Sequence, residues 1–322
     1  MPILITGGAG YIGSHTVNML YKLGDEIIVL DNLVCGHREA IPPKIKFYEG
    51  NINDKNILKK IFDTHDIKSV IHFAAYAYVG ESVIDPQKYY LNNVYGTLNL
   101  LDIMMEYSCT NIVFSSTCAV YGVPTYLPLD EAHKTNPINP YGRTKLIIET
   151  ILEDYNNAYG LRYACLRYFN ACGADNDASI GESHYPETHI IPLLLDSAKN
   201  GKKIVLYGDD FETHDGTCIR DYIHVNDLAK AHLLALKYIK DHEKITCNLG
   251  TGIGTSLKQL IQIVKKITNK EIIYEYGKKR IGDPSELFAS YELAKEKLNW
   301  QSDVNIYDAI NSAWIWMNNK RY

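Results

Sequence analysis

Residues 6–13 read TGGAGYIG, and this stretch decides the fold because it joins an apolar run to a helical period. The run PILIT (2–6) precedes it, and the pattern after it predicts a helix near 11–23. Its glycines satisfy G-x-G-x-x-G (Gly8, Gly10, Gly13) and also G-x-x-G-x-x-G, starting at Gly7. Glycines permit a tight turn and let the backbone approach a pyrophosphate, which the helix N-terminus stabilises. A strand, this loop and a helix in that order predict a dinucleotide site.

Apolar runs alternate with helical periods on the C-terminal side of this loop. Runs rich in Val and Ile occupy 26–31, 45–49, 69–75, 111–116 and 162–170, and helices are predicted near 54–64, 86–108 and 141–159. Short apolar strands separated by helices predict a doubly wound (Rossmann) α/β fold, a parallel sheet covered on both faces. Ligands of such a sheet bind at the carboxyl ends of its strands.

The pattern changes near residue 170, where long polar loops replace the short strands. Helical periods return near 189–200, 226–240, 256–267 and 305–319. Loops of this length within a compact domain are usually functional. We therefore predict a Rossmann domain over 1–169 and mainly a smaller mixed C-terminal lobe over 170–322. Segments at about 221–245 are expected to return to the first domain, because YIHVNDLAKAHLLAL is typical of a strand followed by a helix.

Composition narrows the classes of partner. The chain has 322 residues, a net charge of −5 and no basic block, so neither a nucleic acid nor an anionic membrane surface is expected as a partner. No apolar stretch approaches the roughly 18 residues of a membrane span, and the start does not resemble a signal peptide. The seven cysteines are scattered singly without a CxxC pair, which predicts reduced thiols and a cytoplasmic protein.

The second strand indicates which dinucleotide would bind. Asp31 ends that strand, eighteen residues after Gly13. A carboxylate there accepts hydrogen bonds from the adenosine ribose and repels a 2′-phosphate, which favours NAD over NADP. Arg38, seven residues further on, leaves NADP as an alternative.

Residues 138–149, INPYGRTKLIIE, place Tyr141 and Lys145 one helical turn apart behind Pro140. A free phenol has a pKa near 10, so only about one molecule in a thousand is ionised at pH 7. A lysine ammonium and a cationic nicotinamide would favour the phenolate, which could then remove a proton from a sugar or alcohol hydroxyl. The spacing is common by chance in lysine-rich helices. Its position after a dinucleotide half-domain and after the hydroxyls of 115–117 favours the catalytic interpretation.

The order of motifs resembles that of the extended short-chain dehydrogenase/reductases and, more narrowly, of the UDP-glucose (UDP-galactose) 4-epimerase family. The matching phrases are TGGAGYIG, DNL, HFAA, VGES, NNVYGT, FSST-x-A-VYG, NPYGRTK, LRYFN, DGTCIRDYIHV and NLGTG, which together cover nearly the whole chain. The resemblance implies tightly held NAD in the first domain, a UDP-sugar bound in the second lobe, and an isomerase. It also implies a homodimer built on the helices near 86–108 and 141–159.

The resemblance assigns roles to individual positions. Tyr141 matches the catalytic base, Lys145 its partner on the nicotinamide ribose, and Thr117 a hydroxyl that relays the proton. The NAD-binding set that it implies comprises Gly7, Gly10, Tyr11, Ile12, Gly13, Asp31, Asn32, Asn51, Ile52, Phe73, Ala74, Asn92, Tyr141, Lys145 and Tyr168. The substrate-binding set comprises Thr117, Asn170, His189, Tyr207, Arg220, Arg280, Asp283 and Leu287.

Four positions depart from the family pattern. Asn51 replaces an aspartate that meets the adenine amino group, and Ala77 replaces a lysine near the nicotinamide. His189 stands where asparagine is frequent. Leu287 stands where some relatives have a tyrosine that narrows the sugar pocket, so a leucine leaves room for an N-acetylated sugar.

The residues after Thr117 indicate the reaction. Oxidation at C4 of a UDP-hexose gives a 4-keto sugar, which can be reduced on its other face, dehydrated or decarboxylated. The dehydratases of this superfamily carry an Asp–Glu pair here and the decarboxylases a nearby glutamate, whereas this chain has Cys118 and Ala119. Epimerisation needs no further group and is therefore expected. UDP-N-acetylglucosamine/UDP-N-acetylgalactosamine and UDP-xylose/UDP-arabinose stay open as alternative substrates.

The sequence leaves two alternatives to an epimerase. The first alternative is an NAD-dependent nucleotide-sugar dehydrogenase. The second is a catalytically silent nucleotide-sugar-binding protein, which would be expected to lack Tyr141, Lys145 or Thr117. No metal is expected, because the loop histidines show neither HExxH nor Cys/His spacing: His184, His189, His214 and His224.

Overall fold

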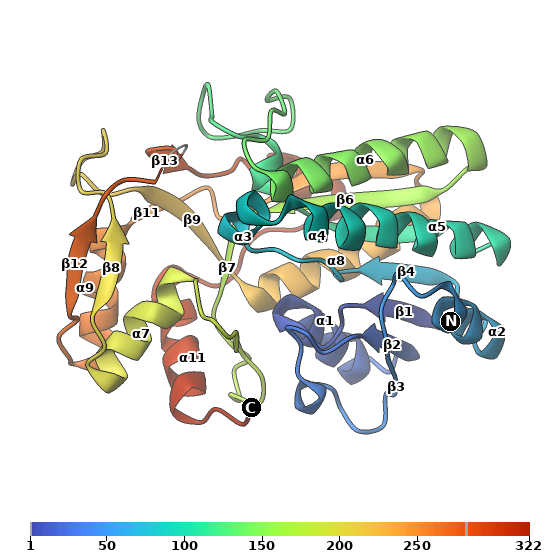
Figure 1. Cartoon of the computed structure of the whole chain (residues 1–322), viewed down its shortest axis with the longest axis horizontal. Coiled ribbons are helices and arrows are strands. Elements are labelled where there is room, and N and C mark those ends of the chain that lie inside the picture. The colour runs from blue at the N-terminus through green and yellow to red at the C-terminus, as the bar shows by residue number, and fades with distance from the viewer. Residues whose placement is uncertain (1, 281–282) are drawn as a thin grey trace.

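The computed structural model describes residues 2–280 and 283–322 and has two layers of helices around a parallel sheet (Figure 1). This sheet has seven strands in the order β10-β6-β5-β4-β1-β2-β3, and every neighbouring pair is parallel. Its strands are β1 (Ile3–Thr6), β2 (Ile27–Asp31), β3 (Lys46–Glu49), β4 (Ser69–His72), β5 (Asn111–Thr117), β6 (Arg162–Tyr168) and β10 (Lys244–Leu249). The strand order reverses between β1 and β4, which is where such sheets bind their ligands. The predicted fold class is confirmed.

Each face of the sheet has its own hydrophobic core. In β1, Ile3 and Ile5 belong to one core and Leu4 to the other, because successive side chains of a strand point to opposite faces. The first core is covered by α1 (Tyr11–Lys22), α8 (Val225–Asp241) and α10 (Glu292–Leu298). The second is covered by α2 (Lys55–Thr64), α5 (Gly96–Glu106) and α6 (Pro140–Tyr159). Burial of both faces explains why the strands read as unbroken apolar runs.

The helix predicted near 86–108 is divided. It comprises α4 (Pro86–Tyr89), a π-helical turn (Tyr90–Tyr95) and α5, and α3 (Val79–Ile84) precedes it. In the π turn, Asn93 accepts from the backbone N–H of Tyr76 and donates to the Tyr76 carbonyl and to Thr144. Widened turns of this kind occur frequently at functional sites. Two short 3₁₀ turns, Arg38–Ala40 and Cys118–Val120, follow β2 and β5.

The second lobe is built on two small sheets. A four-stranded sheet contains β7 (Asn170–Cys172), β9 (Ile219–His224), β11 (Gly254–Ser256) and β13 (Glu286–Leu287), and β8 (Ile204–Tyr207) pairs with β12 (Tyr274–Gly277). The helices of this lobe are α7 (Ile190–Asn200), α9 (Leu257–Thr268) and α11 (Ile306–Asn318). Within the described ranges, no helix combines the length and apolar character that a membrane crossing requires.

The segment expected to return to the first domain is split between the two lobes. Helix α8 packs on the large sheet against α1, and β10 extends that sheet beside β6. Strand β9 instead pairs with β7, β11 and β13 in the smaller lobe. The boundary between strand and helix at Val225 is therefore also the point where the chain passes from one sheet to the other.

Candidate active site

The glycine loop after β1 has the shape that a dinucleotide needs. A Cβ at Gly13 would lie 2.3 Å from the carbonyl oxygen of Gly7, and one at Gly7 (φ +70°) would lie 2.5 Å from the backbone nitrogen of Ala74, so the fold itself requires both glycines. A Cβ at Gly10 would meet only the Gly7 carbonyl, at 3.4 Å. Gly10 caps the N-terminus of α1, and a side chain there would fill the space that a pyrophosphate occupies. The loop thus fits a bound dinucleotide.

Asp31 lies beside this loop at the end of β2. Its carboxylate accepts from the backbone N–H groups of Ala9 (2.9 Å) and Leu33 (2.8 Å), which fixes its position against the loop. Burial raises the pKa of this carboxyl, and the two hydrogen bonds counteract the rise. Arg38 stacks over the ring of Phe47 at 4.7 Å and donates to the Ile41 carbonyl. Because Arg38 is engaged elsewhere, the arrangement favours NAD over NADP.

The other residues of the predicted NAD set lie on neighbouring loops of the same sheet edge. The backbone N–H groups of Phe73 and Ala74 donate to the Thr6 carbonyl and hold the loop after β4 against β1. Tyr11 donates to the Gly173 carbonyl at 2.6 Å and thereby links the glycine loop to the second lobe. Asn92, in the π turn, is buried and donates to Asn93. Asn32 and Asn51 each accept a hydrogen bond from a nearby backbone N–H. Ile52 is buried in the loop after β3, and Ile12 lies on α1. Ala77, one of the positions that depart from the family pattern, lies on the loop before α3.

Tyr141 and Lys145 lie together in the first turn and a half of α6. Pro140 opens that helix and the side chain of Asn139 caps it by accepting from the Gly142 N–H at 2.8 Å, as the sequence around Pro140 predicted. The Lys145 ammonium donates to the Ser115 carbonyl of β5 at 2.7 Å and lies 6.0 Å from the centre of the Tyr141 ring. Thr117, the last residue of β5, is hydrogen-bonded to Tyr141. The three predicted catalytic side chains are therefore adjacent and buried.

Burial opposes ionisation of both partners. It raises the pKa of Tyr141 well above its usual value near 10; nearby Tyr168 adds to the rise, and the hydrogen bond with Thr117 counteracts it. Burial lowers the pKa of Lys145 to about 7, although the Glu149 carboxylate counteracts this. The chain alone therefore does not generate a phenolate at neutral pH. A cation bound beside Tyr141 would supply the missing electrostatic stabilisation.

A buried ionic network lies behind these residues, and no pattern in the sequence predicted it. Glu149, one turn beyond Lys145, accepts from Ser116 Oγ at 2.5 Å and from Arg167 Nε and Nη2 at 3.0 and 2.5 Å. Arg167 also donates to the Tyr121 hydroxyl, which donates to Asn248. The helical periodicity predicts only that Glu149 lies on a helix. Its pairing with Arg167 was not predicted, because Arg167 lies on β6 and is distant in the sequence.

The predicted diphosphate residues converge in the second lobe. Asp283 contacts Arg220 Nη2 at 3.3 Å and Arg280 at 2.9 Å, and Arg280 stacks over the Tyr207 ring at 5.3 Å. Arg220 is 11% exposed and Arg280 63% exposed. Two guanidinium groups share one carboxylate, so the cluster keeps an excess positive charge, which suits a diphosphate.

This cluster is connected to the catalytic strand through β13. Leu287 is paired with Arg220 and packs against an apolar cluster that includes Cys118 and Phe169. Cys118 follows Thr117, and burial raises the pKa of its thiol to about 12, although the positive charge of Arg220 counteracts part of the rise. Phe169 lies between Tyr168 and Asn170, two further predicted site residues. The predicted gate position thus lies between the arginines and the catalytic hydroxyls.

His189 has a different environment from the one expected. Its Nδ1 contacts Glu182 at the N-cap of α7, in a group that also contains His184 and Glu187. The expectation of a contact with the substrate diphosphate or sugar stays a prediction. The grouping of His189 with Glu182, His184 and Glu187 was not predicted, because it follows neither the HExxH nor the Cys/His spacing.

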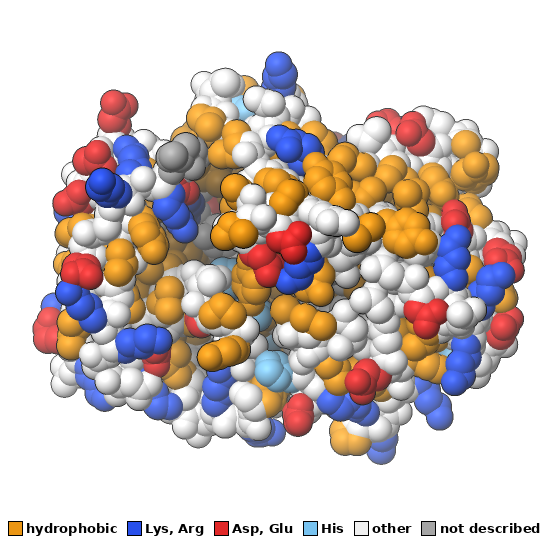
Figure 2. Space-filling view, in the orientation of Figure 1, with side chains coloured by type: hydrophobic (Ala, Val, Ile, Leu, Met, Phe, Trp, Pro, Cys, Tyr) orange, Lys and Arg blue, Asp and Glu red, His pale blue; other side chains and the backbone are white. Residues whose placement is uncertain are grey.

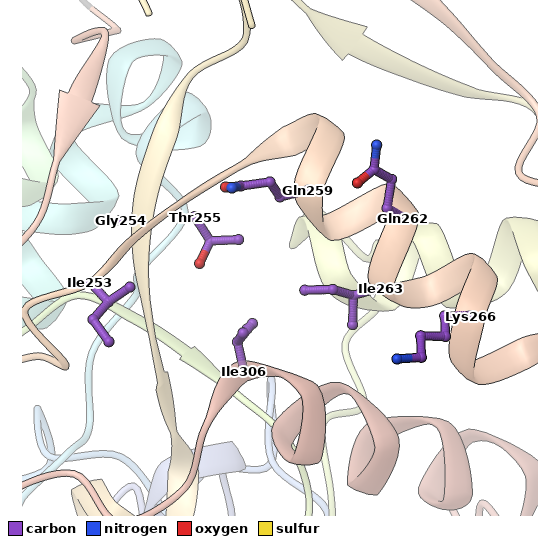
Figure 3. Close-up of a pocket in the computed structure, with 8 residues that line it drawn as sticks. All are labelled: Ile253, Gly254, Thr255, Gln259, Gln262, Ile263, Lys266 and Ile306. Atoms are coloured by element: carbon purple, nitrogen blue, oxygen red, sulfur yellow. The ribbon is translucent and has the colours of Figure 1, made fainter. Parts of the chain in front are cut away.

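A separate hollow of about 390 Å³ lies on the second lobe (Figure 3). Its lining comes from β11, α9 and the start of α11, with Thr255, Gln259 and Ile263 facing it and Ile306 opposite (Figure 3). None of the predicted site residues lines it. We therefore place the candidate active site at the carboxyl edge of the large sheet and not in this hollow.

Comparison with known proteins gives consistent matches. The family model "NAD dependent epimerase/dehydratase family" matches residues 3–250. A UDP-glucose 4-epimerase of Halalkalibacterium halodurans is 49% identical over 98% of this chain and 95% of its own. The crystal structure of the Brucella ovis UDP-glucose 4-epimerase, in complex with NAD, superposes with a TM-score of 0.94 at 48% identity and covers 98% of both chains. A UDP-Glc/GlcNAc 4-epimerase of Campylobacter jejuni superposes with a TM-score of 0.86 at 39% identity, covering 99% of both chains.

Proposed function

Because this chain belongs to the NAD-dependent epimerase/dehydratase family, it is an isomerase that uses NAD to epimerise a UDP-hexose at C4, and we propose that Tyr141 is its general base. The observation that carries the assignment of the base is the buried contact of Tyr141 with Thr117 and Lys145 at the carboxyl edge of the large sheet. The two residues after Thr117 are Cys118 and Ala119, so neither of these positions carries the carboxylic acid that a dehydratase has there.

The glycine loop and the loops beside it would hold NAD, with Gly10 under the pyrophosphate and Asp31 on the adenosine ribose. Bound NAD supplies an acceptor that takes a hydride from the sugar and later returns it. Lys145 would hold the nicotinamide ribose from α6, since its ammonium is already fixed by the Ser115 carbonyl. The rest of the predicted set lies along the same edge of the sheet.

The protein groups then move one proton in each direction. The Tyr141 phenolate accepts the proton of the 4-hydroxyl, directly or through Thr117, as the hydride leaves C4. The 4-keto sugar turns in its pocket, and Tyr141 returns the proton when the hydride adds to the other face. A base must therefore be able to take up and release its proton, which a phenol with a hydrogen-bonding hydroxyl beside it can do.

UDP would be held by the second lobe while the sugar turns. Arg220 and Arg280 would bind the diphosphate, Asp283 the uridine ribose and Asn170 the nucleotide sugar. The excess positive charge around Asp283 supports this placement. Binding energy on the nucleotide leaves the sugar free to rotate, which epimerisation requires. We also propose that residues 1–169, together with α8 and β10, form the NAD-binding part, and that the rest of 170–322 is mainly the UDP-sugar-binding part.

An NMR assay with UDP-glucose tests the reaction. We expect interconversion with UDP-galactose without added NAD and without net NADH. A dehydrogenase would instead accumulate NADH in proportion to product. A binding protein would leave the sugar unchanged.

Leu287 supports a second sugar class. Leu287 packs against Cys118 and Phe169 with a side chain smaller than a tyrosine, and the C. jejuni relative is named for both UDP-Glc and UDP-GlcNAc. We expect Leu287→Tyr to suppress turnover of UDP-N-acetylglucosamine while sparing UDP-glucose, measured side by side by NMR with UDP-xylose as a third substrate. An equal loss on both hexoses would refute the role of Leu287 as a gate.

An apolar surface on the first domain favours a homodimer. Exposed apolar side chains gather on α3 to α6, where Figure 2 shows a broad patch of hydrophobic atoms: Val79, Val83, Ile84, Leu91, Tyr95 and Tyr159. Patches of this kind usually mark protein interfaces. Sedimentation or light scattering should give twice the chain mass, and a monomer would contradict the proposal.

We also propose a cytoplasmic location, because the seven cysteines are unpaired and six of them are buried.

A further inference from the structure

The connection between β7 and α7 gathers four side chains that bind metals in proteins. Within the stretch ESHYPETH (182–189), Glu182, His184, Glu187 and His189 each offer one ligand atom, and these atoms lie within 4.8 Å of one another. The spacing E-x-H-x-x-E-x-H is not one of the common zinc spacings, which is why the sequence did not predict it.

The nitrogen–oxygen distances in this group span those of hydrogen bonds and those of the edges of a metal site, and His189 Nδ1 is hydrogen-bonded to Glu182. His184 Nδ1 lies 3.2 Å from Glu182 Oε1 and 3.7 Å from Glu187 Oε2, and His189 Nδ1 lies 3.7 Å from Glu187 Oε1. Ligands about 2.1 Å from a tetrahedral zinc ion are about 3.4 Å apart. His189 and Glu182 are closer than that edge and would separate as an ion enters. His189, with 53% of its side chain exposed, has room to move.

One nitrogen in the group is left without a hydrogen bond. His184 Nδ1 is buried and has no hydrogen-bond partner among the described residues, although it faces two carboxylates. A buried polar atom without a partner is costly, and a bound ion would satisfy it. Glu182 is itself 7% exposed, so its negative charge needs positive charge nearby, which a protonated histidine or a bound ion would supply.

The backbone and outer contacts hold the ligands in place. Glu187 Oε1 accepts from the N–H groups of Thr188 and His189 at 2.7 and 2.8 Å. The Glu182 carbonyl accepts from Trp316 of α11 at 2.8 Å, and the Ser183 carbonyl contacts His37 Nε2 at 2.9 Å. Outer contacts of this kind orient the ligands of metal sites. The segment runs past the C-terminus of the chain, as Figure 1 shows.

We propose that Glu182, His184, Glu187 and His189 form a Zn²⁺ site that fastens the β7–α7 connection. Two imidazoles and two carboxylates suit zinc, whereas Mg²⁺ prefers oxygen ligands and water. The ring of His184 stands edge-on to those of Tyr11 and Tyr78, 6.3 and 6.2 Å between centres. An ion on His184 therefore fixes the second lobe against the glycine loop. The role is structural, and the proposal does not depend on which sugar is epimerised.

Zinc binding by the full-length protein with its NAD tests this site. After dialysis against a chelator, Zn²⁺ is titrated in competition with a chromophoric chelator. We expect one tight equivalent per chain and a rise in the melting temperature that Mg²⁺ at the same concentration does not produce. Co²⁺ should give the visible absorption of a four-coordinate site. The proposal would be overturned if the protein bound no Zn²⁺ or melted at the same temperature with and without it. In that case, protonated histidines would balance the charge of the carboxylates.

Variants locate the ion. His184→Gln should weaken Zn²⁺ binding by at least about 100-fold, which is the upper end of the loss seen when only an outer contact is removed. Glu187→Gln, at the more exposed rim, should also weaken it and guards against a folding defect in the first variant. His214→Gln removes an exposed histidine beside Asp215, outside the group, and should bind as the wild type does. Retained binding in His184→Gln and Glu187→Gln, or an equal loss in His214→Gln, would refute the site.

Discussion

Tyr141 and Lys145 are buried between regular elements of the large sheet, whereas Arg280 stands 63% exposed on a loop of the smaller lobe. The first pair is fixed by the Ser115 carbonyl, Thr117 and the network of Glu149. Arg280 is instead held by Asp283, a carboxylate that it shares with Arg220, and the buried Arg220 also donates to the Ile219 carbonyl at 2.8 Å. A proton transfer requires fixed distances between the base and its neighbours. A nucleotide-binding arginine must instead be able to exchange its ion pair with Asp283 for one with the diphosphate. The catalytic end is therefore the rigid end of the site, whereas the diphosphate end includes one exposed cation, Arg280.

The largest expected effect is at the rigid end. Tyr141→Phe removes the proposed base while keeping the ring that fills the pocket. We expect kcat to fall by about 10²- to 10⁴-fold, the range for lost general acid–base catalysis, with UDP affinity nearly unchanged. Steady-state kinetics and UDP titration measure both. Unchanged turnover would exclude Tyr141 as the base and remove the basis of the comparison.

The next effect concerns the support behind that end. Glu149→Gln leaves Arg167 buried without its counter-charge, so the free energy of unfolding should fall by about 3–5 kcal/mol. Glu153→Gln is a matched control one turn further along α6, because Glu153 pairs with Lys244 at the surface and such pairs contribute at most about 1 kcal/mol. Urea denaturation of the two variants gives the difference. Similar losses in both would show that the network does not support the catalytic end.

The residues changed in these two variants illustrate which features could be predicted from the sequence and which could not. The glycine loop, the strand runs and the helix periods depend on local patterns, so the fold and the helix ends, such as α7 at 190–200, followed from them. Pairings between distant segments do not leave a local pattern. The Glu149–Arg167 pair, the π turn at Asn93 and the group around His184 were therefore missed. The pattern predicts that the strand containing YIH returns to the first domain, yet β9 lies in the smaller sheet, because periodicity alone does not reveal which strands are neighbours.

The substrate residues have a different origin. Arg280, Asp283 and Tyr207 came only from the family resemblance, since no spacing connects them to a diphosphate. The structure brings them together, while their role stays a prediction. Tyr141 and Lys145 were visible as a spacing, but only neighbouring motifs distinguished that spacing from chance.

At the diphosphate end we expect smaller and unequal effects. Arg220→Ala should raise KM for the UDP-sugar by about 10- to 100-fold, since hydrogen bonds to charged groups contribute about 1.5–3 kcal/mol. Arg280→Ala should raise it less, because solvent screens an exposed guanidinium. Turnover at saturation should change little in both, as initial rates over a range of UDP-glucose would show. A larger effect at Arg280, or a fall in kcat alone, would contradict the division of tasks.

A final prediction tests burial at the rigid end through its pH dependence. Burial lowers the pKa of Lys145 to about 7 in the folded chain, against about 10.4 for an unfolded lysine. Below pH 7 the side chain is charged in both states and the full cost of burying that charge is present. Between pH 7 and about 10.4 the unfolded chain binds more protons, so rising pH stabilises the folded protein through this group. Lys145→Met, which has no charge to bury, should therefore exceed the wild type in stability most at pH 7 and less at pH 9. Urea denaturation of both proteins after removal of NAD measures the gap, and a gap that stays constant or widens would show that Lys145 is not held in a desolvated site.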